Sequence, residues 1–158
     1  MQQRCIATGL PLVYAHLVGG QDEVVFEGRS FALQSDGQLA GRALAFTEDA
    51  FDVHCTSVAS GLNLQAPTHE LHEDLSDVWH ALVMGVRDYI EKNRFPSVLL
   101  GLSGGIDSAL VLAIAVDALG ANRVRAVMMP SPYTANISLI DARDMAERDR
   151  KSTRLNSS

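Results

Sequence analysis

The stretch that decides the fold is residues 97–129, SVLLGLSGGIDSALVLAIAVDALGANRVRAVMM. It begins with a short apolar run over residues 97–102, which is typical of a strand buried on both faces of a parallel sheet. After two adjacent glycines, residues 108–119 are apolar on nearly all sides and predict a buried helix that ends at Gly120. A second apolar run, residues 124–129, ends at Pro130 and predicts the next strand.

Helical patterns flank this stretch on both sides. Upstream, apolar residues recur every three or four positions and so lie on one helical face: Leu71, Leu75, Val78, Leu82, Val86 and Ile90. Thr68 precedes them as a candidate cap. Downstream, Ser138 with Asp141 three residues later resembles a capping box that opens a helix through Arg148. This alternation of helices and strands predicts an α/β fold with a doubly wound parallel sheet.

The first third of the chain has strand patterns without this alternation. Short apolar runs predict strands over residues 10–18, 24–26, 30–33, 38–46 and 50–55. Gly19-Gly20 is expected to end the first of them, and Asp36-Gly37 predicts a hairpin turn in which both residues have positive φ. Residues 56–70 are polar and small and are interpreted as a linker. We therefore expect one domain piece over residues 1–55 and a second over residues 71–150.

Composition excludes several classes of function. The 158 residues contain 13 Lys and Arg against 19 Asp and Glu, which gives a formal charge of −6. This balance argues against nucleic acid or an anionic membrane as a partner, because both need clustered cations. No apolar run approaches the ~20 residues that span a bilayer, and no signal segment opens the chain. Because Cys5 and Cys55 are too few for a disulfide framework, we expect a soluble, cytoplasmic protein.

The loop over residues 101–108, GLSGGIDS, joins the first predicted strand to the buried helix. Adjacent Gly104 and Gly105 let the backbone approach a ligand, and N–H groups at the start of a helix bind anions. Ser103 and Ser108 add hydroxyl donors on either side. The carboxylate of Asp107 is explained if a divalent cation bridges it to phosphate oxygens. These residues indicate a phosphate site with its own metal ligand.

The same loop fits other patterns less well. No lysine follows Gly105, as a P-loop requires, and the spacing differs from the dinucleotide fingerprint G-x-G-x-x-G. Residues 101–105 do match G-x-S-x-G, the nucleophile elbow of α/β-hydrolases, with Ser103 as the nucleophile. An elbow needs an acid and a histidine later in the chain, whereas all five histidines precede Ser103. The elbow also gives Asp107 no role. The hydrolase elbow remains the alternative interpretation, and a tight structural turn without a ligand is the third.

Residues 103–108, SGGIDS, resemble the S-G-G-x-D-S loop of the N-type ATP pyrophosphatases. Within that group the chain resembles the glutamine-dependent NAD synthetase family. Residues 128–134, MMPSPYT, followed by Ser138 and Asp141-Ala142, are similar to the family's segment after the second strand. Residues 9–28 are similar to the end of its nitrilase-like glutaminase domain.

This resemblance implies the end of a nitrilase-like α-β-β-α sandwich followed by the first part of an ATP pyrophosphatase domain of the adenine nucleotide alpha hydrolase-like type. It implies a ligase that adenylates deamido-NAD with ATP, releases pyrophosphate, and forms NAD and AMP with ammonia from glutamine. Asp107 would bind Mg²⁺, Met129 would lie near the adenine, and the full-length enzyme would be a homo-oligomer. The expected ATP-binding residues are Gly101, Leu102, Ser103, Gly104, Gly105, Ile106, Asp107, Ser108 and Met129.

Other parts of the family pattern are expected outside this chain. The Glu, Lys and nucleophilic Cys of the glutaminase belong upstream, and neither Cys5 nor Cys55 has catalytic neighbours, so we assign no catalytic residue. The ligands of deamido-NAD are expected beyond Arg150. Residues 151–158 are interpreted as a mobile, non-native tail. We therefore expect an internal fragment of a bifunctional enzyme, inactive by itself.

Overall fold

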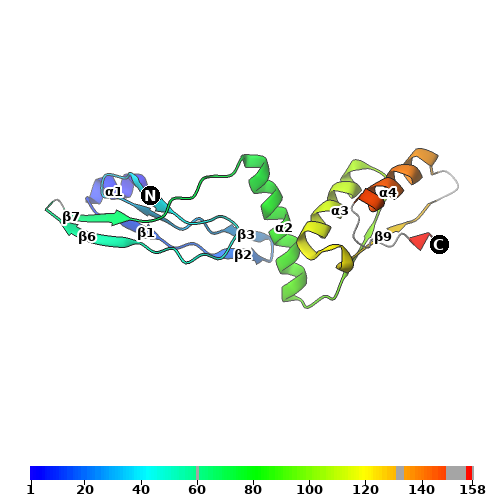
Figure 1. The fold of residues 1–158 in the computed structure, drawn as a ribbon, viewed down its shortest axis with the longest axis horizontal. Coiled ribbons are helices and arrows are strands. Elements are labelled where there is room, and N and C mark those ends of the chain that lie inside the picture. The colour runs from blue at the N-terminus through cyan, green and yellow to red at the C-terminus, as the bar shows by residue number, and fades with distance from the viewer. Residues whose placement is uncertain (60, 131–133, 149–155, 158) are drawn as a thin grey trace. The chain divides into compact units, whose positions relative to one another are not determined.

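The computed structural model describes residues 1–59, 61–130, 134–148 and 156–157 (Figure 1). Contacts within the chain divide it into two compact units. The first consists of Met1–Gly19 and Glu23–Ala81, and the second of Gly20–Asp22 and Leu82–Ser158. Apart from residues 156–157, the predicted tail lies outside the described residues.

The first unit combines a short helix with antiparallel strands. Helix α1 (Gln2–Thr8) ends at Gly9, which is left-handed with a φ of 66°. No helix was predicted here, because the segment is too short to show helical periodicity; its buried side chain is that of Cys5. Three strands form an antiparallel sheet in the order β1-β4-β5: β1 (Leu12–Tyr14), β4 (Phe31–Leu33) and β5 (Leu39–Arg42).

The hairpin between β4 and β5 occurs where Asp36-Gly37 predicted it, with a different turn geometry. The Gln34 N–H donates to the Gln38 carbonyl at 2.8 Å, and the Gly37 N–H donates to the Gln34 carbonyl at 2.9 Å. Gly37 has a φ of +83°, whereas Asp36 does not have a positive φ. The prediction that both residues have positive φ is wrong, because a three-residue loop needs a single left-handed residue.

Strands β2 (Val18–Gln21) and β3 (Val24–Glu27) form a second hairpin. The strand predicted over residues 10–18 is therefore split, because β1 pairs with β4 while β2 pairs with β3. Gly19-Gly20, expected to break a strand, lies inside β2 and is buried. The chain turns instead at Asp22, which is left-handed with a φ of 53°.

A third hairpin occupies much of the segment that we expected to be a linker, residues 56–70. Strands β6 (His54–Val58) and β7 (Gly61–Gln65) pair antiparallel along their whole length. The strand predicted over residues 50–55 thus begins only at His54. Every residue of β6 is exposed. Since neither face of β6 is buried, the sequence lacks the alternation by which a strand is recognised.

Helix α2 (Asp74–Lys92) begins later than predicted, and its buried side chains are those of Met84 and Ile90, of which only Ile90 belongs to the predicted apolar face. Thr68 is not its cap and instead forms an isolated β-bridge with Arg42 of β5. Most of the predicted apolar face is exposed, and Leu75 is 83% exposed. Met84, by contrast, is 3% exposed. It lies beside Gly85, where the absence of a side chain lets the backbone of Gly20 come close. Tertiary packing therefore decides which apolar positions of α2 are buried.

The second unit contains a parallel sheet, as predicted. Its strands lie in the order β10-β9-β8, and both pairs are parallel. The elements in chain order are β8 (Val98–Gly101), α3 (Ile106–Leu119), the 3-10 turn η1 (Ala121–Arg123), β9 (Val124–Met128), α4 (Asn136–Arg148) and β10 (Asn156–Ser157). The predicted order of strand, loop, helix, strand and helix is confirmed.

The core of this unit lies between the sheet and helices α3 and α4 (Figure 1). Leu112, Val124 and Ala142 come from α3, β9 and α4 and are fully buried together. Both helices therefore cover the same face of the sheet. Leu99, on the other face of β8, is 70% exposed. Among the described residues, helices thus pack on one face of the sheet, whereas the doubly wound fold that we expected has helices on both faces.

Two helix boundaries differ from their predictions. Helix α3 begins at Ile106, slightly earlier than expected, and ends as predicted at Gly120, which has a φ of 77°. Helix α4 begins at Asn136, so Ser138 lies within its first turn and does not open a capping box. The Ser138 N–H instead donates to the Ala135 carbonyl at 3.0 Å.

Cys5 is buried, Cys55 is exposed, and both are free thiols. No helix in the described part of the chain combines the length and apolar character needed to cross a membrane.

Candidate functional site

Two parallel strands end side by side at the predicted loop. Strand β8 ends at Gly101, and Leu102 extends the ladder because its N–H donates to the Val127 carbonyl at 2.9 Å. A Cβ atom at Gly101 would lie 3.7 Å from the Cε methyl of Met129. Met129, 79% exposed, therefore lies against the end of β8. The carboxyl ends of parallel strands are where open α/β sheets bind ligands, so the structure brings together two expected site residues, Gly101 and Met129.

Ser103 and Ser108 brace the loop through its own backbone. The Ser108 hydroxyl donates to the Gly105 carbonyl at 2.9 Å, and its oxygen accepts the Ser103 N–H at 3.2 Å. The Ser103 Oγ accepts the Gly105 N–H at 3.2 Å and lies 3.0 Å from the Ser108 Oγ. Because the Ser108 proton is already directed to a carbonyl, Ser103 is the donor between the two hydroxyls. Both hydroxyls thus hold the loop in shape.

The two adjacent glycines have different surroundings. At Gly104 φ is +83°, and a Cβ atom would lie 2.3 Å from the Ser138 carbonyl oxygen. Packing against the first turn of α4 therefore accounts for a glycine at this position. At Gly105 the backbone is extended, with φ −90° and ψ 158°. A Cβ atom there would meet, among the described residues, the Ser103 Oγ at 3.4 Å and nothing else within 4 Å. The chain leaves open space in front of α3 at Gly105.

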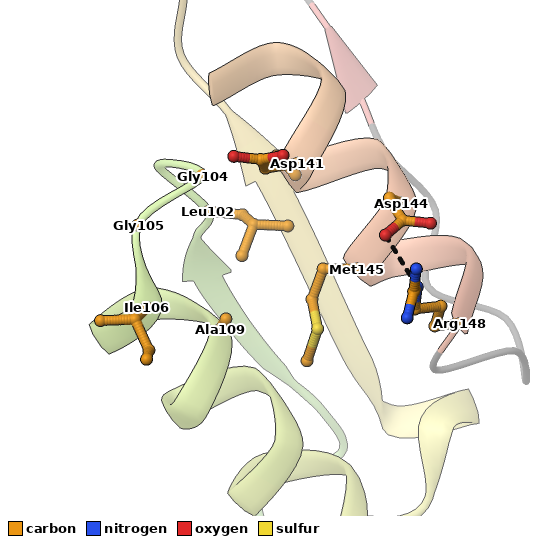
Figure 2. A pocket seen from close by; sticks show the side chains of 10 residues that line it. Leu102, Gly104, Gly105, Ile106, Ala109, Asp141, Asp144, Met145 and Arg148 are labelled. Atoms are coloured by element: carbon orange, nitrogen blue, oxygen red, sulfur yellow. Dashed lines mark ion pairs between the residues drawn. The ribbon is translucent and has the colours of Figure 1, made fainter. Parts of the chain in front are cut away.

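A pocket of about 490 Å³ opens between this loop and α4 (Figure 2). The residues that line it are Leu102, Gly104, Gly105, Ile106, Ala109, Asp141, Ala142, Asp144, Met145 and Arg148. Figure 2 shows Asp141 next to the loop at Gly104, and the side chains of Leu102 and Met145 lying in the space between the loop, α3 and α4. Expected site residues outside this lining are Gly101, Ser103, Asp107, Ser108 and Met129.

Helix α4 gives the pocket its charged groups, none of which was predicted as a site residue. Asp144 and Arg148 form an ion pair with 2.7 Å between Oδ2 and Nε. The Asp144 carboxylate raises the pKa of Arg148. Asp141 is a second carboxylate on the same wall. The spacing of four residues between Asp144 and Arg148 is the signal that could have indicated the pair.

Asp107 lies exposed in the first turn of α3. Within the described ranges, no three His, Cys, Asp or Glu side chains gather into a metal site. Mg²⁺ usually binds one or two carboxylates together with substrate phosphates and keeps several waters. One accessible carboxylate beside an anion-attracting helix end fits a Mg²⁺ that arrives with a nucleotide, and does not fit one held by the protein alone.

The hydrolase elbow is not supported by this geometry. An elbow places its nucleophilic serine on a strained turn next to a histidine base. Here the left-handed residue is Gly104, and Ser103 does not have a positive φ. The hydrogen-bond partners of the Ser103 Oγ are Ser108 and the Gly105 N–H. All five histidines of the chain belong to the first unit.

Comparison with known sequences identifies relatives of most of the chain. The model of the family described as NAD synthase matches residues 78–156. The glutamine-dependent NAD(+) synthetase of Rhodobacter capsulatus is 46% identical over an alignment of 150 residues, and the match covers 92% of this chain and 26% of that protein. The glutamine-dependent NAD(+) synthetase of Acinetobacter baylyi is 44% identical over 137 residues, which are 87% of this chain and 25% of that protein.

Solved structures agree with the sequence comparisons. The glutamine-dependent NAD+ synthetase from Acinetobacter baumannii, in complex with ADP, has a TM-score of 0.88 and 42% identity. That match covers 98% of this chain and 29% of the other. The glutamine-dependent NAD(+) synthetase from Cytophaga hutchinsonii is 16% identical with a TM-score of 0.76, over 98% of this chain and 31% of the other. At that identity the likeness concerns the fold alone.

The chain spans about a quarter of the length of the curated relatives it matches. The family match begins within α2 and includes the loop between β8 and α3, both parallel strands β8 and β9, and helix α4. The resemblance first indicated by SGGIDS is thereby confirmed for the segment that contains the candidate site. The chain belongs to the NAD synthase family.

Proposed function

We propose that the second unit binds the phosphate groups of ATP at the N-terminal end of α3. The observation that supports this most directly is the open space at Gly105, where a Cβ atom would meet only the Ser103 Oγ, at 3.4 Å, among the described residues. The first N–H groups of a helix have no partner inside the helix, and together with the helix dipole they attract anions. The ADP bound by the relative from Acinetobacter baumannii is a ligand of the same class.

The adenosine part of ATP has apolar surfaces available on both sides of the loop. Met129 is exposed at the end of β9 beside Gly101, and the pocket next to Leu102 is lined by apolar side chains of α3 and α4. A purine ring is flat and apolar on its faces, so contact with a flexible methionine suits it. We place the base against Met129.

The carboxylates around the loop indicate that the phosphates would bind together with a cation. The pocket wall has two carboxylates, Asp141 and Asp144, and one guanidinium, Arg148, which Asp144 already pairs. A polyphosphate near these carboxylates would be repelled unless its charge were neutralised. Asp107 would hold Mg²⁺, which when bound neutralises the charge that develops on the leaving pyrophosphate. Ser103 and Ser108 keep the loop in the shape that directs the helix N–H groups outward.

We further propose that a complete enzyme carrying this sequence makes NAD. The nicotinate carboxylate of deamido-NAD would attack the α-phosphorus of ATP, forming an adenylate and releasing pyrophosphate. Ammonia from glutamine hydrolysis would then displace AMP. Supporting this are the names of the relatives, glutamine-dependent NAD(+) synthetases. In this proposal residues 1–55 end a nitrilase-like glutaminase domain, and residues 71–150 begin a doubly wound ATP pyrophosphatase domain.

The products distinguish this reaction from other uses of ATP. A complete enzyme carrying this sequence, given ATP, Mg²⁺, deamido-NAD and ammonium, should form one AMP and one pyrophosphate for each NAD. Formation of ADP and phosphate would contradict adenylation. Absence of NAD with every substrate at saturation would contradict the proposed function as a whole.

A covalent probe tests the alternative elbow directly. A fluorophosphonate, which labels serines activated by a histidine base, should leave Ser103 unmodified. Peptide mapping by mass spectrometry reads the result, and a known serine hydrolase in the same sample serves as the positive control. A fluorophosphonate adduct on Ser103 would favour the hydrolase.

A further inference from the structure

The tip of the β2–β3 hairpin is bound to α2 through both polar atoms of one glycine. The Gly20 N–H donates to the Asp88 Oδ2 at 2.8 Å, and the Gly20 carbonyl accepts from the Lys92 Nζ. Asp88 and Lys92 also pair with each other, with 3.4 Å between Oδ2 and Nζ. We call Gly20, Asp88 and Lys92 the hairpin joint. All three belong to the second unit.

Close packing reinforces these polar contacts. Gly20 is buried in β2. A Cβ atom on it would lie 3.2 Å from the Gly85 Cα and 3.3 Å from the Asp88 Cβ. Met84, at 3% exposure, is buried in the same turn of α2. A glycine on each side thus lets strand and helix backbones approach, while Asp88 and Lys92 take up the main-chain polar groups that burial would otherwise leave unpaired.

The joint unites residues from two different parts of the chain. Asp88 and Lys92 lie inside the segment matched by the NAD synthase family, which begins at residue 78. Gly20 lies outside that match, in the segment that resembles the end of the glutaminase domain. The chain enters the second unit at Gly20 and leaves it after Asp22. The hairpin tip is therefore glutaminase-like sequence held by side chains of the synthetase-like segment.

We propose that the hairpin joint is a positioning device that couples glutamine hydrolysis to NAD formation. This inference rests on the proposed function, in which ammonia made by one part of the enzyme is used by the other. Ammonia that escapes into bulk water is diluted and protonated, so the two parts must be held in one arrangement during transfer. Among the described residues, the polar contacts of Asp88 and Lys92 are with Gly20, with Arg87 and with each other, and none of these is assigned to chemistry. Their role is to hold the hairpin tip on α2.

Four variants of a complete enzyme carrying this sequence test the proposal. Asp88→Ala removes the acceptor of the Gly20 N–H, whereas Asp88→Asn keeps an acceptor oxygen and removes the charge. Lys92→Met keeps the length of the side chain and removes the donor to the Gly20 carbonyl. Asp74→Asn is the matched control, since it removes the charge of an exposed carboxylate in the first turn of the same helix.

Each variant is assayed for NAD formed per glutamine hydrolysed, for NAD formed from ammonium, and for hydrogen exchange at the Gly20 amide. Loss of a hydrogen bond to a charged group should speed exchange in Asp88→Ala at least about tenfold. We expect NAD per glutamine to fall about twofold or more in Asp88→Ala and in Lys92→Met, with ammonium-dependent NAD formation and glutaminase rate unchanged. Asp88→Asn should restore part of the loss, and Asp74→Asn should match the wild type.

Two outcomes would overturn this inference alone. One is an unchanged ratio of NAD to glutamine while exchange at Gly20 is faster, because an open joint would then not affect coupling. The other is an equal loss of ammonium-dependent NAD formation in Asp88→Ala, because Asp88 would then serve the synthetase itself. If the wild-type enzyme forms no NAD from either nitrogen source, the proposed function fails first, which separates the two conclusions.

Discussion

Exchanging Gly105 for alanine should weaken nucleotide binding and leave the fold intact. The new Cβ atom would lie 3.4 Å from the Ser103 Oγ, an ordinary contact, on backbone that is already extended. Alanine caps a helix less well than glycine, at a cost of about 0.5 kcal/mol. The same methyl group would stand in front of the α3 N–H groups. Loss of one hydrogen bond to a charged phosphate costs about 1.5–3 kcal/mol, which raises the Kd of ATP about 10- to 150-fold.

The same exchange at Gly104 should act first on the fold. Alanine would have to adopt a φ near +83° and bring its Cβ atom to 2.3 Å from the Ser138 carbonyl oxygen. The left-handed conformation costs about 1–2 kcal/mol. Moving α4 away to relieve the overpacking costs about 1–3 kcal/mol more. The free energy of unfolding should therefore fall by about 2–5 kcal/mol in Gly104→Ala and by less than about 1 kcal/mol in Gly105→Ala.

Urea unfolding measures the stabilities, and isothermal titration calorimetry with ATP and Mg²⁺ measures the Kd, both in a complete enzyme carrying this sequence. Gly105→Ser is the control, because serine is a favoured N-cap but also places a Cβ atom in the open space. If weak capping were the cause, Gly105→Ser would bind ATP normally. A wild-type Kd in folded Gly105→Ala, or wild-type stability in Gly104→Ala, would refute this account of the loop.

Three further changes test the metal ligand, an ion pair and the core. Asp107→Asn should weaken Mg²⁺-dependent ATP binding at least about tenfold, since an amide binds hard cations poorly; equal calorimetric affinity would contradict the metal role. The Arg29 guanidinium donates to both Asp77 oxygens at 2.6 and 2.5 Å and holds the pKa of that carboxyl below its usual 3.8. Because this pKa is lower in the folded than in the unfolded state, the ion pair stabilises the fold above about pH 4, and this stabilisation is lost as the pH falls. Between pH 7 and pH 3, urea unfolding should therefore show a smaller loss of stability in Arg29→Met than in the wild type. In residues 1–158, Leu112→Ala should lower the unfolding free energy by about 3 kcal/mol, and Leu75→Ala, at an 83% exposed position, by less than about 0.5 kcal/mol.

Much of the candidate site was predictable because its signals are local. Residues 97–129 contain an apolar run, two glycines and a helix closed by Gly120, and the structure has β8, α3 and β9 in that order. The groups proposed to bind phosphate and Mg²⁺ are neighbours in the sequence, and the hydrogen bonds of Ser103 and Ser108 stay within six residues of chain. The pocket was not predictable, because Asp141 and Asp144 come from a helix that meets the loop only in the folded chain.

By itself, the sequence determined the order of strands and helices in the second unit, the composition of the phosphate loop and the family. Apolar runs, capping glycines and a short motif express these properties locally. Only the tertiary structure decided which side chains of α2 are buried, that residues 54–65 form a hairpin, and that Gly104 faces Ser138 while Gly105 faces open space. The burial on α2 and the contact of Gly104 with Ser138 depend on residues far apart in the chain, and the hairpin, although its own pairs are local, is hydrogen-bonded at Leu64 to the distant Gln34. A pattern read along the chain does not contain the partner that makes such a contact.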